Sequence, residues 1–265
     1  MLKSHQTLKQ KLEHHYKLFD KTKLEPDPLQ FPHRYKDKKD IELIAFISSI
    51  FAYGNINQIM NTLTKITTLL GKLPIDYLNK SNKNKIRKDF KGIIHRFFTN
   101  EDIINFILLL KGIYSNYNSL EEIFMKGYNS EVLNIKSSLE NLSKTLLTNF
   151  ESMLGDNNIT RGIKFMIPFP SNGSACKRMN LFLRWMVRKD ELDFGLWECV
   201  DKSKLVIPVD THIARICKEL KLTKMKNVSW KMAEEITNNL KQIDDKDPVK
   251  YDFAICHIGM RKLIF

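Results

Sequence analysis

Two short segments of the sequence contain residue types that can do imine chemistry on a sugar. Lys177 follows a turn rich in proline and glycine, and Asp210 lies further along the chain, after an apolar run that ends in a proline. A lysine amine is a nucleophile toward a sugar carbon, and a carboxylate can stabilise positive charge or accept a proton. If the two side chains face one cleft, they predict Schiff-base chemistry. Asp210 is also a good helix N-cap residue, so a purely structural role stays open.

The turn before Lys177 is suited to binding an anion. Residues 167–176 read Ile-Pro-Phe-Pro-Ser-Asn-Gly-Ser-Ala-Cys and lead directly into an amphipathic helix. Gly173 suits a hairpin with unusual dihedral angles, and the start of a helix presents free N–H groups to negative charge. Arg178 and Arg184 add positive charge nearby. An ordinary helix with a basic face explains the segment equally well.

A third segment, near the C-terminal end, places a carboxylate on an otherwise apolar stretch. Asp247 and Pro248 are expected to cap and begin a buried helix. Asp252 then lies between Tyr251 and Phe253, where a carboxylate needs a partner or a ligand. A paired structural aspartate and a ligand-binding aspartate both fit this pattern.

Composition narrows the class of protein. The chain has 265 residues, of which 43% are hydrophobic, and Lys+Arg 43 against Asp+Glu 30 gives a net charge of +13. This much apolar content excludes a disordered tail and predicts one large domain or two small ones. The positive charge is spread along the chain and fits a polyanionic partner or an ordinary solvated surface.

Neither a membrane nor a resident metal is indicated. The longest weakly charged apolar run, residues 43–53, is far shorter than the roughly 18 residues that a membrane span needs, and the N-terminus leads into charges rather than into a secretory signal. We therefore expect an intracellular protein. No pair of cysteines has the close spacing of zinc or iron–sulfur ligands, which predicts buried free thiols. They are Cys176, Cys199, Cys217 and Cys256.

Helical spacing of apolar residues predominates, and strand-like alternation is scarce, so the predicted class is all-α. Asp40 is expected to cap a central helix over 41–53, which Gly54 ends, and a second helix is expected over 55–71. Ser119 with Glu122 is a capping-box pattern. The other helices expected in this part of the chain cover residues 83–98, 101–115, 120–126 and 131–150.

The segments that contain these candidate residues resemble segments of a known superfamily. Residues 209–217, Val-Asp-Thr-His-Ile-Ala-Arg-Ile-Cys, look like the catalytic-aspartate segment of the helix-hairpin-helix DNA glycosylases, the endonuclease III-like superfamily. Residues 169–173 resemble the Leu-Pro-Gly-x-Gly hairpin that precedes it, and residues 54–59 resemble the polar insertion that fills the gap left by an extruded base. Residues 177–185 and 247–253 are most similar to an uncharacterised bacterial family allied with the archaeal 8-oxoguanine glycosylases.

The resemblance implies two helical domains with a cleft between them. Residues 45–205 would form a central barrel that contains the helix-hairpin-helix, and residues 1–44 and 206–265 would form the second domain. It also implies a base-excision repair glycosylase with AP lyase activity, a monomer that removes an oxidised purine, 8-oxoguanine first, from double-stranded DNA. The four-cysteine loop of endonuclease III is absent, so no cluster is expected, although the hairpin has room for a monovalent cation. The location implied is the bacterial cytoplasm, with the nucleoid.

The same resemblance implies a role for each site residue. Lys177 attacks the sugar C1′ after burial and the neighbouring Arg178 have lowered its pKa, and Asp210 stabilises the developing positive charge. The extruded base would enter a pocket of Asp252, Phe253 and Cys256. The residues implied to contact DNA are Asn55, Asn57, Gln58, Asn172, Gly173, Ser174, Arg178, Arg184, His212 and Lys250.

Two departures from the superfamily pattern concern the lysine. The first glycine of the hairpin is Ser171, and the usual lysine position is Ala175. Lys177 comes two residues later, which would be about 200° around a helix if the helix had already begun at Ala175. The archaeal branch also uses a displaced lysine, and Lys164 is the reserve candidate. The alternatives are a monofunctional glycosylase that uses Asp210 and water, and a non-catalytic helix-hairpin-helix DNA-binding protein.

Overall fold

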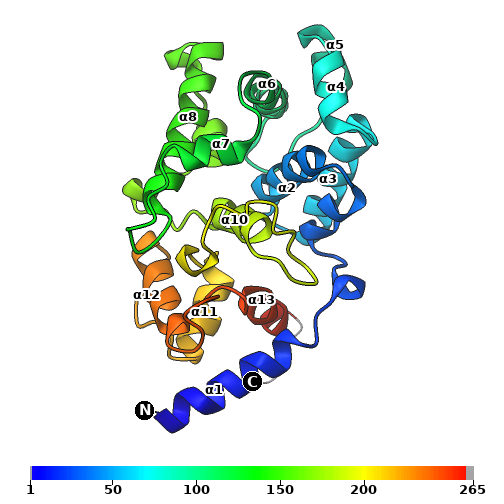
Figure 1. Cartoon of the computed structure of the whole chain (residues 1–265). Coiled ribbons are helices and arrows are strands. Elements are labelled where there is room, and N and C mark those ends of the chain that lie inside the picture. The colour runs from blue at the N-terminus through cyan, green and yellow to red at the C-terminus, as the bar shows by residue number, and fades with distance from the viewer. Residues whose placement is uncertain (1, 261–265) are drawn as a thin grey trace. The chain divides into compact units, whose positions relative to one another are not determined.

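The computed structural model describes residues 2–260, and the side chains of residues 7–256. Helices form all of the regular structure in this described part, which contains no β-strand (Figure 1). The predicted all-α class is therefore confirmed. The described chain divides into two compact units, of which unit 1 comprises residues 2–24, 130–135 and 170–260 and unit 2 comprises residues 25–129 and 136–169.

Unit 2 is organised around one buried helix. Every residue of α2 (Lys38–Phe51) from Asp40 onward is buried, as expected for a helix with apolar residues on most of its faces. This helix packs against α3 and α4. Gly54 separates α2 from α3, and Asn55 caps α3. The other helices are α3 (Ile56–Leu70), α4 (Pro74–Lys80), α5 (Lys83–Asp89), α6 (Asn100–Asn116), α7 (Leu120–Met125), α8 (Lys136–Leu154) and α9 (Arg161–Met166).

The expected cap of the central helix is wrong by one turn. Asp37, not Asp40, is the N-cap of α2, and its side chain accepts hydrogen bonds from the amides of Lys39 and Asp40. Asp40 lies inside the helix, where its Oδ1 accepts a hydrogen bond of 2.8 Å from the amide of Ile75. Both aspartates suit a cap by type, and the contact of Asp40 with α4 decides between them.

Two expected helices have different bounds in the structure. The helix expected over 83–98 ends at Asp89, because Gly92 has a φ of +81° and the chain then turns back on itself at residues 95–98. The helix expected over 131–150 begins at Lys136. Residues 130–135 are irregular and belong to unit 1, where the Ile135 amide donates to the Lys204 carbonyl over 3.2 Å.

Unit 1 contains the remaining long helices, and large aromatic side chains fill its core. Trp185, Trp197, Trp230 and Tyr251 are all fully buried. Helix α13 packs against both α1 and α11. The helices are α1 (Leu2–Tyr16), α10 (Lys177–Val187), α11 (Thr211–Glu219), α12 (Trp230–Lys241) and α13 (Asp252–Met260).

The expected start of the last helix is wrong. Helix α13 begins at Asp252 rather than at Pro248, and residues 247–251 form turns. Asp247 does not cap a helix, because its carboxylate is occupied: Oδ1 accepts a hydrogen bond of 2.8 Å from Nε of Arg188. An ion pair far apart in the sequence therefore overrides a local capping signature.

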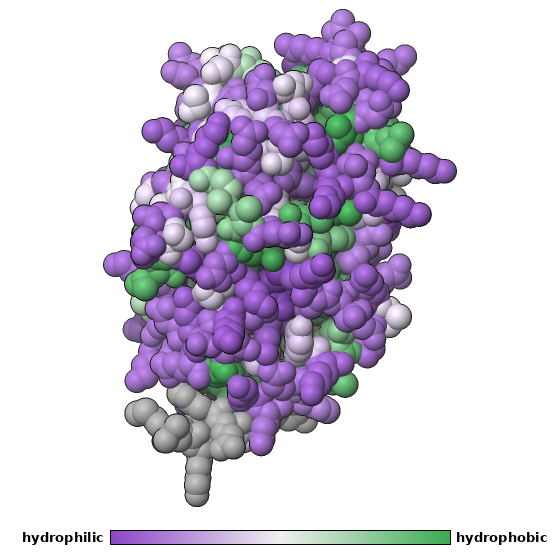
Figure 2. All heavy atoms as spheres, viewed as in Figure 1, coloured by the Kyte–Doolittle hydropathy of each residue, from purple (hydrophilic) through white to green (hydrophobic). Residues whose placement is uncertain are grey.

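The contact-defined units follow other boundaries than the expected domains. Residues from Pro170 onward, including the hairpin, group with the N-terminal helix, whereas residues 25–44 group with unit 2. The division at 45–205 and the cleft with its helix-hairpin-helix arrangement stay predictions. On the face shown in Figure 2, hydrophilic side chains predominate and smaller apolar areas interrupt them. In the described residues, no helix has both the length and the apolar character of a membrane span.

Candidate functional site: a lysine–aspartate pair in unit 1

The structure brings Lys177 and Asp210 into direct contact. The Lys177 Nζ lies 2.9 Å from the Asp210 Oδ2, and the two side chains are 29% and 34% exposed. Both residues belong to unit 1, so the pair is formed by that unit alone. A half-buried ammonium–carboxylate pair that solvent reaches is a candidate site, because a ligand can approach both groups.

The turn before α10 fixes the direction of Lys177. Residues Pro170–Asn172 form a single 3-10 turn, after which Gly173 has a φ of +78° and donates its amide to the Pro170 carbonyl over 3.0 Å. Cys176 has a left-handed conformation (φ +47°), so α10 begins only at Lys177. The helical rotation of about 200° between Ala175 and Lys177 therefore does not arise, because the segment between them is not helical.

Asp210 has two roles at once. As the N-cap of α11 it accepts hydrogen bonds of 2.9 Å from the amides of His212 and Ile213, both at Oδ1. The structural reading of this residue is thereby confirmed. The second oxygen, Oδ2, is the one that faces Lys177. The cap holds the carboxylate in place and leaves one oxygen for the amine.

The charges of the pair stabilise each other. Burial alone would lower the pKa of the Lys177 ammonium, but Asp210, with smaller contributions from Cys256 and Asp252, raises that pKa above its ordinary value. Burial alone would raise the pKa of Asp210, but Lys177 and the two helix amides lower it. The expectation of a lowered lysine pKa is wrong: the site holds an ammonium and a carboxylate.

A second, largely buried ionic cluster lies at the C-terminal end of α10. Arg184 pairs with Asp193 and Asp252, and its side chain is only 3% exposed. One turn later, Arg188 pairs with Asp193 and, over 2.9 and 2.8 Å, with Asp190 and Asp247. We call these six residues the buried ionic cluster: Arg184, Arg188, Asp190, Asp193, Asp247 and Asp252.

Three of the basic residues expected to contact DNA are not displayed on the surface. Arg184 is enclosed in the buried ionic cluster, and Arg178 is 6% exposed. The Lys250 ammonium lies 2.7 Å from carboxylate oxygens of both Glu13 and Asp244. Because their charges are buried or neutralised, this structure gives no support to phosphate contacts by Arg184, Arg178 or Lys250.

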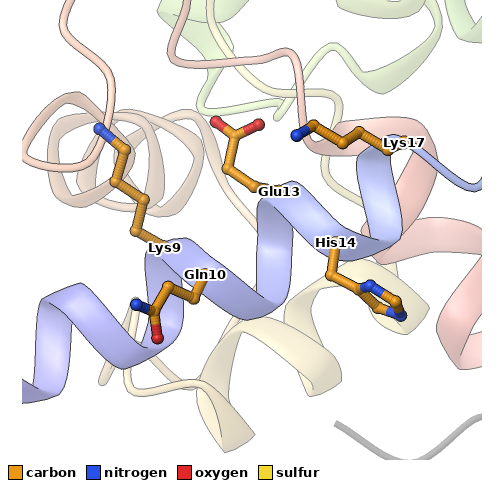
Figure 3. A pocket seen from close by; sticks show the side chains of 5 residues that line it. All are labelled: Lys9, Gln10, Glu13, His14 and Lys17. Atoms are coloured by element: carbon orange, nitrogen blue, oxygen red, sulfur yellow. The ribbon is translucent and has the colours of Figure 1, made fainter.

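The partner of Lys250 also lines a pocket on α1. This open pocket has a volume of about 500 Å³, and Figure 3 shows Lys9, Glu13 and Lys17 on one side of the helix. Its one carboxylate, on Glu13, accepts a hydrogen bond of 2.6 Å from the Tyr251 hydroxyl. The only acidic group in the lining therefore serves to hold α1 against the segment before α13.

The expected base pocket is closed in this structure. Asp252 is enclosed and its Oδ2 is bound by Arg184. Phe253 is 5% exposed, and its ring packs edge-on against Phe19 with centroids 5.3 Å apart. Of the three residues, Cys256 is the one that is partly exposed, and it acts electrostatically on Lys177. Of the two interpretations of Asp252, this structure shows the paired structural aspartate, because Arg184 of the same unit binds its carboxylate.

The remaining expected DNA contacts lie on the surface of either unit. In the hairpin, Asn172 and Gly173 are exposed, and Ser174 is half-buried with its Oγ accepting from the Cys176 amide. His212 is half-buried, and its Nε2 makes no hydrogen bond within the described chain. The expected DNA contacts that belong to unit 2 are all exposed, and they are Asn55, Asn57 and Gln58.

The four cysteines form no disulfide bond with one another in the structure. Cys176 and Cys217 are buried as expected, and burial raises the pKa of the Cys217 thiol. Cys199 is exposed, which contradicts the expectation of buried thiols throughout. Within the described residues, no three His, Cys, Asp or Glu side chains are grouped in a way that suits a metal ion.

Comparison with known proteins gives one match. A family model with the description "Protein of unknown function (DUF2400)" matches residues 27–261. No curated protein and no solved structure matches the chain. Since the match covers nearly the whole sequence, the chain belongs to the DUF2400 family.

Proposed function

We propose that this protein is a DNA glycosylase with AP lyase activity, which removes an oxidised purine from double-stranded DNA. The observation that carries the proposal is the contact of 2.9 Å between the Lys177 amine and the Asp210 carboxylate, both accessible to solvent. These are the residues that the resemblance to the helix-hairpin-helix glycosylases assigns to catalysis. The oxidised purine to test first is 8-oxoguanine.

In the proposed reaction Lys177 is the nucleophile. Its amine nitrogen forms a bond to the sugar C1′ while the C1′–N bond to the damaged base breaks, and the base leaves with that electron pair. The carboxylate of Asp210 stabilises the positive charge that develops on the sugar. Opening of the sugar ring then gives an imine, from which β-elimination breaks the bond between C3′ and its phosphate oxygen.

The lysine must lose a proton before it attacks. Asp210 Oδ2 lies within hydrogen-bond distance of Nζ and is the acceptor that we assign to this proton. The pKa directions oppose this transfer in the free protein, since the lysine pKa is raised and the aspartate pKa is lowered. The transfer must therefore be coupled to substrate binding, which removes water and changes the field around both groups.

The exposed polar residues support a DNA partner. Asn172 and Gly173 belong to a hairpin whose backbone amides suit phosphate, and the net charge of +13 favours a polyanion. Extrusion of a base from a duplex costs a few kcal/mol. Asn55, Asn57 and Gln58 are the exposed side chains that we assign to the vacated base stack, and a monovalent cation at the hairpin remains part of the proposal.

One observation favours a second candidate, a monofunctional glycosylase. Because its pKa is raised, Lys177 is an ammonium at neutral pH and is poorly prepared to attack carbon. In that case Asp210 works with a water molecule, and the ammonium binds phosphate or holds the carboxylate. The two candidates differ in whether an imine forms.

The experiment is borohydride trapping of the imine on duplexes that contain 8-oxoguanine, uracil or an abasic site. The wild-type protein is expected to give a covalent adduct, and Lys177→Gln is expected to give none. Lys164→Gln, which removes the reserve lysine in unit 2, separates the two lysine assignments. A fluorescence measurement of duplex binding on the same variants shows whether the loss lies in chemistry or in affinity.

Three results would be decisive. An adduct that persists in Lys177→Gln but disappears in Lys164→Gln would overturn the assignment of Lys177. Base release without any adduct would favour the monofunctional enzyme. Binding without base release on every duplex would contradict the enzyme and leave a DNA-binding protein.

A further inference from the structure

A tight turn in unit 2 presents an arginine and a phenylalanine to solvent. The amide of His95 donates to the Phe98 carbonyl over 3.1 Å, and the amide of Phe98 donates back to His95 over 2.8 Å, with Arg96 and Phe97 at the tip. The Phe97 side chain is 65% exposed. Arg96 has a φ of +51°, which costs a non-glycine residue energy, and strained residues of this kind cluster at functional sites.

Buried contacts hold the base of this turn. His95 is 2% exposed, and its two ring nitrogens lie 3.0 Å from the Thr62 hydroxyl and 3.2 Å from the Tyr53 carbonyl. The Phe97 amide donates to the Tyr53 hydroxyl over 3.2 Å. The position of the exposed ring is therefore set before any partner arrives, which lowers the entropic cost of binding.

Phe97 is part of a surface made of rings and one guanidinium. Its ring stacks on Tyr53 at an interplanar angle of 22°, with centroids 6.2 Å apart, and meets Phe165 edge-on at 6.0 Å. Phe165 is 41% exposed. The Arg96 guanidinium lies 5.3 Å from the Tyr53 ring and 5.4 Å from the Phe97 ring. We call Tyr53, Arg96, Phe97 and Phe165 the aromatic patch.

The glycine beside the patch makes room for the arginine. Gly54 has a φ of +103°, and a Cβ at this position would lie 2.5 Å from the Arg96 side chain. The residues that follow Gly54 include the exposed amides of Asn55, Asn57 and Gln58. Groups that hydrogen-bond base edges therefore adjoin the aromatic patch in the sequence.

We propose that the aromatic patch binds an unpaired nucleobase of single-stranded DNA, which stacks on Phe97. Exposed rings give stacking surface for any base, and an arginine held over them binds the phosphate backbone and adds cation–π attraction. The positive charge of +13 suits a nucleic acid rather than an apolar protein surface. This binding requires neither the lysine–aspartate pair nor a damaged base.

The test uses an undamaged single-stranded oligonucleotide of thymidines with one 2-aminopurine, whose fluorescence is quenched on stacking. Fluorescence anisotropy gives the affinity, and the 2-aminopurine signal reports the stacking. Phe97→Ala is expected to weaken binding about 5- to 150-fold and to remove the quenching, because it deletes one stacking ring. Phe97→Trp is expected to retain both.

The matched control is Leu73→Ala, which shortens another exposed apolar side chain of unit 2, 60% exposed, and should leave affinity and quenching unchanged. Circular dichroism establishes that each variant is folded. Absence of binding by the wild-type protein, or equal binding and quenching by Phe97→Ala, would overturn the proposal. So would a change in self-association as the sole effect of Phe97→Ala. Because the assay contains no lesion, its outcome is independent of the trapping experiment.

Discussion

Helix α10 carries two ionic sites that differ in exposure. At its first residue, Lys177 meets Asp210, and both side chains remain about one-third exposed. At its other end, Arg184 in the last turn and the C-cap residue Arg188 are each 3% exposed, and they meet carboxylates that are buried or largely buried. Basic residues at both ends of one helix thus pair with carboxylates. One pair is accessible to a ligand, and the other ion pairs are enclosed by the protein.

The two sites differ in the number of ionic partners that each basic side chain has. Each arginine of the buried ionic cluster has at least two carboxylate partners, and the planar guanidinium satisfies them in fixed directions. Lys177 pairs with the carboxylate of Asp210, whose other oxygen caps the start of α11. Many fixed partners suit a structural site, whereas a partly exposed pair leaves room for a ligand to approach.

Removal of an arginine from the buried ionic cluster is expected to have the largest effect on stability. Arg188→Ala leaves Asp193, Asp190 and Asp247 without their shared cation in a buried site, and breaking such a pair costs about 3–5 kcal/mol. Urea denaturation measures this free energy of unfolding.

A matched arginine outside the cluster provides the control. Arg215 forms an exposed ion pair of 2.8 Å with Glu219 on α11, and Arg215→Ala is expected to change the free energy of unfolding by no more than about 0.5 kcal/mol. If the two variants were equally stable, the cluster would not have the structural role that its burial indicates.

Replacement of Asp210 is expected to have an intermediate effect that depends on pH. Asp210→Ala removes a helix cap, which costs about 0.5–2 kcal/mol at pH 7. The pKa of Asp210 is lowered from its ordinary 3.8, so its contribution is complete above that value and is lost as the pH falls through the lowered pKa. Denaturation of the wild type and the variant at pH 7 and near pH 2 tests this.

One result would contradict this expected pH dependence of the stability of wild type relative to Asp210→Ala. If the difference in stability between wild type and Asp210→Ala stayed constant down to pH 2, folding would not lower the pKa of Asp210, and the ion pair with Lys177 would not stabilise the carboxylate. Duplex binding retained by this variant, with base release lost, would further separate the catalytic role from the cap.

The sequence predicts local structure well where a single segment decides it. Ser119 is the N-cap of α7, as its spacing from Glu122 indicates, and its Oγ accepts from the Glu122 amide over 3.1 Å. It fails at Asp40 and Asp247, which have the right type for a cap but are occupied by groups distant in the sequence. Local signatures are shared by many positions, and only tertiary contacts select among them.

The candidate site shows the same limit. Lys177 and Asp210 stand out by type and position, and the structure places them in contact. The sequence marks Asp252 as a carboxylate that needs a partner, but it gives no sign that the partner is Arg184 or that the buried ionic cluster forms around it. Phe97 falls within the helix that the sequence predicts over 83–98, whose apolar spacing gives no sign of the turn at 95–98 that exposes it.

Of the three ionic residues Arg188, Asp210 and Lys177, Lys177 is expected to have the smallest effect on stability and the most complete effect on chemistry when it is replaced. Lys177→Met keeps the apolar stem and removes one half-exposed charge, so the free energy of unfolding should change by no more than about 1 kcal/mol. Because the pKa of Lys177 is raised above its ordinary 10.5, that contribution is complete at neutral pH and is lost only above 10.5. Denaturation at pH 7 measures the effect on stability, and borohydride trapping measures the effect on chemistry. A loss of stability as large as that of Arg188→Ala would make the pair a structural element like the buried ionic cluster, whereas a stable protein without an adduct would show that accessibility is what separates the two ends of α10.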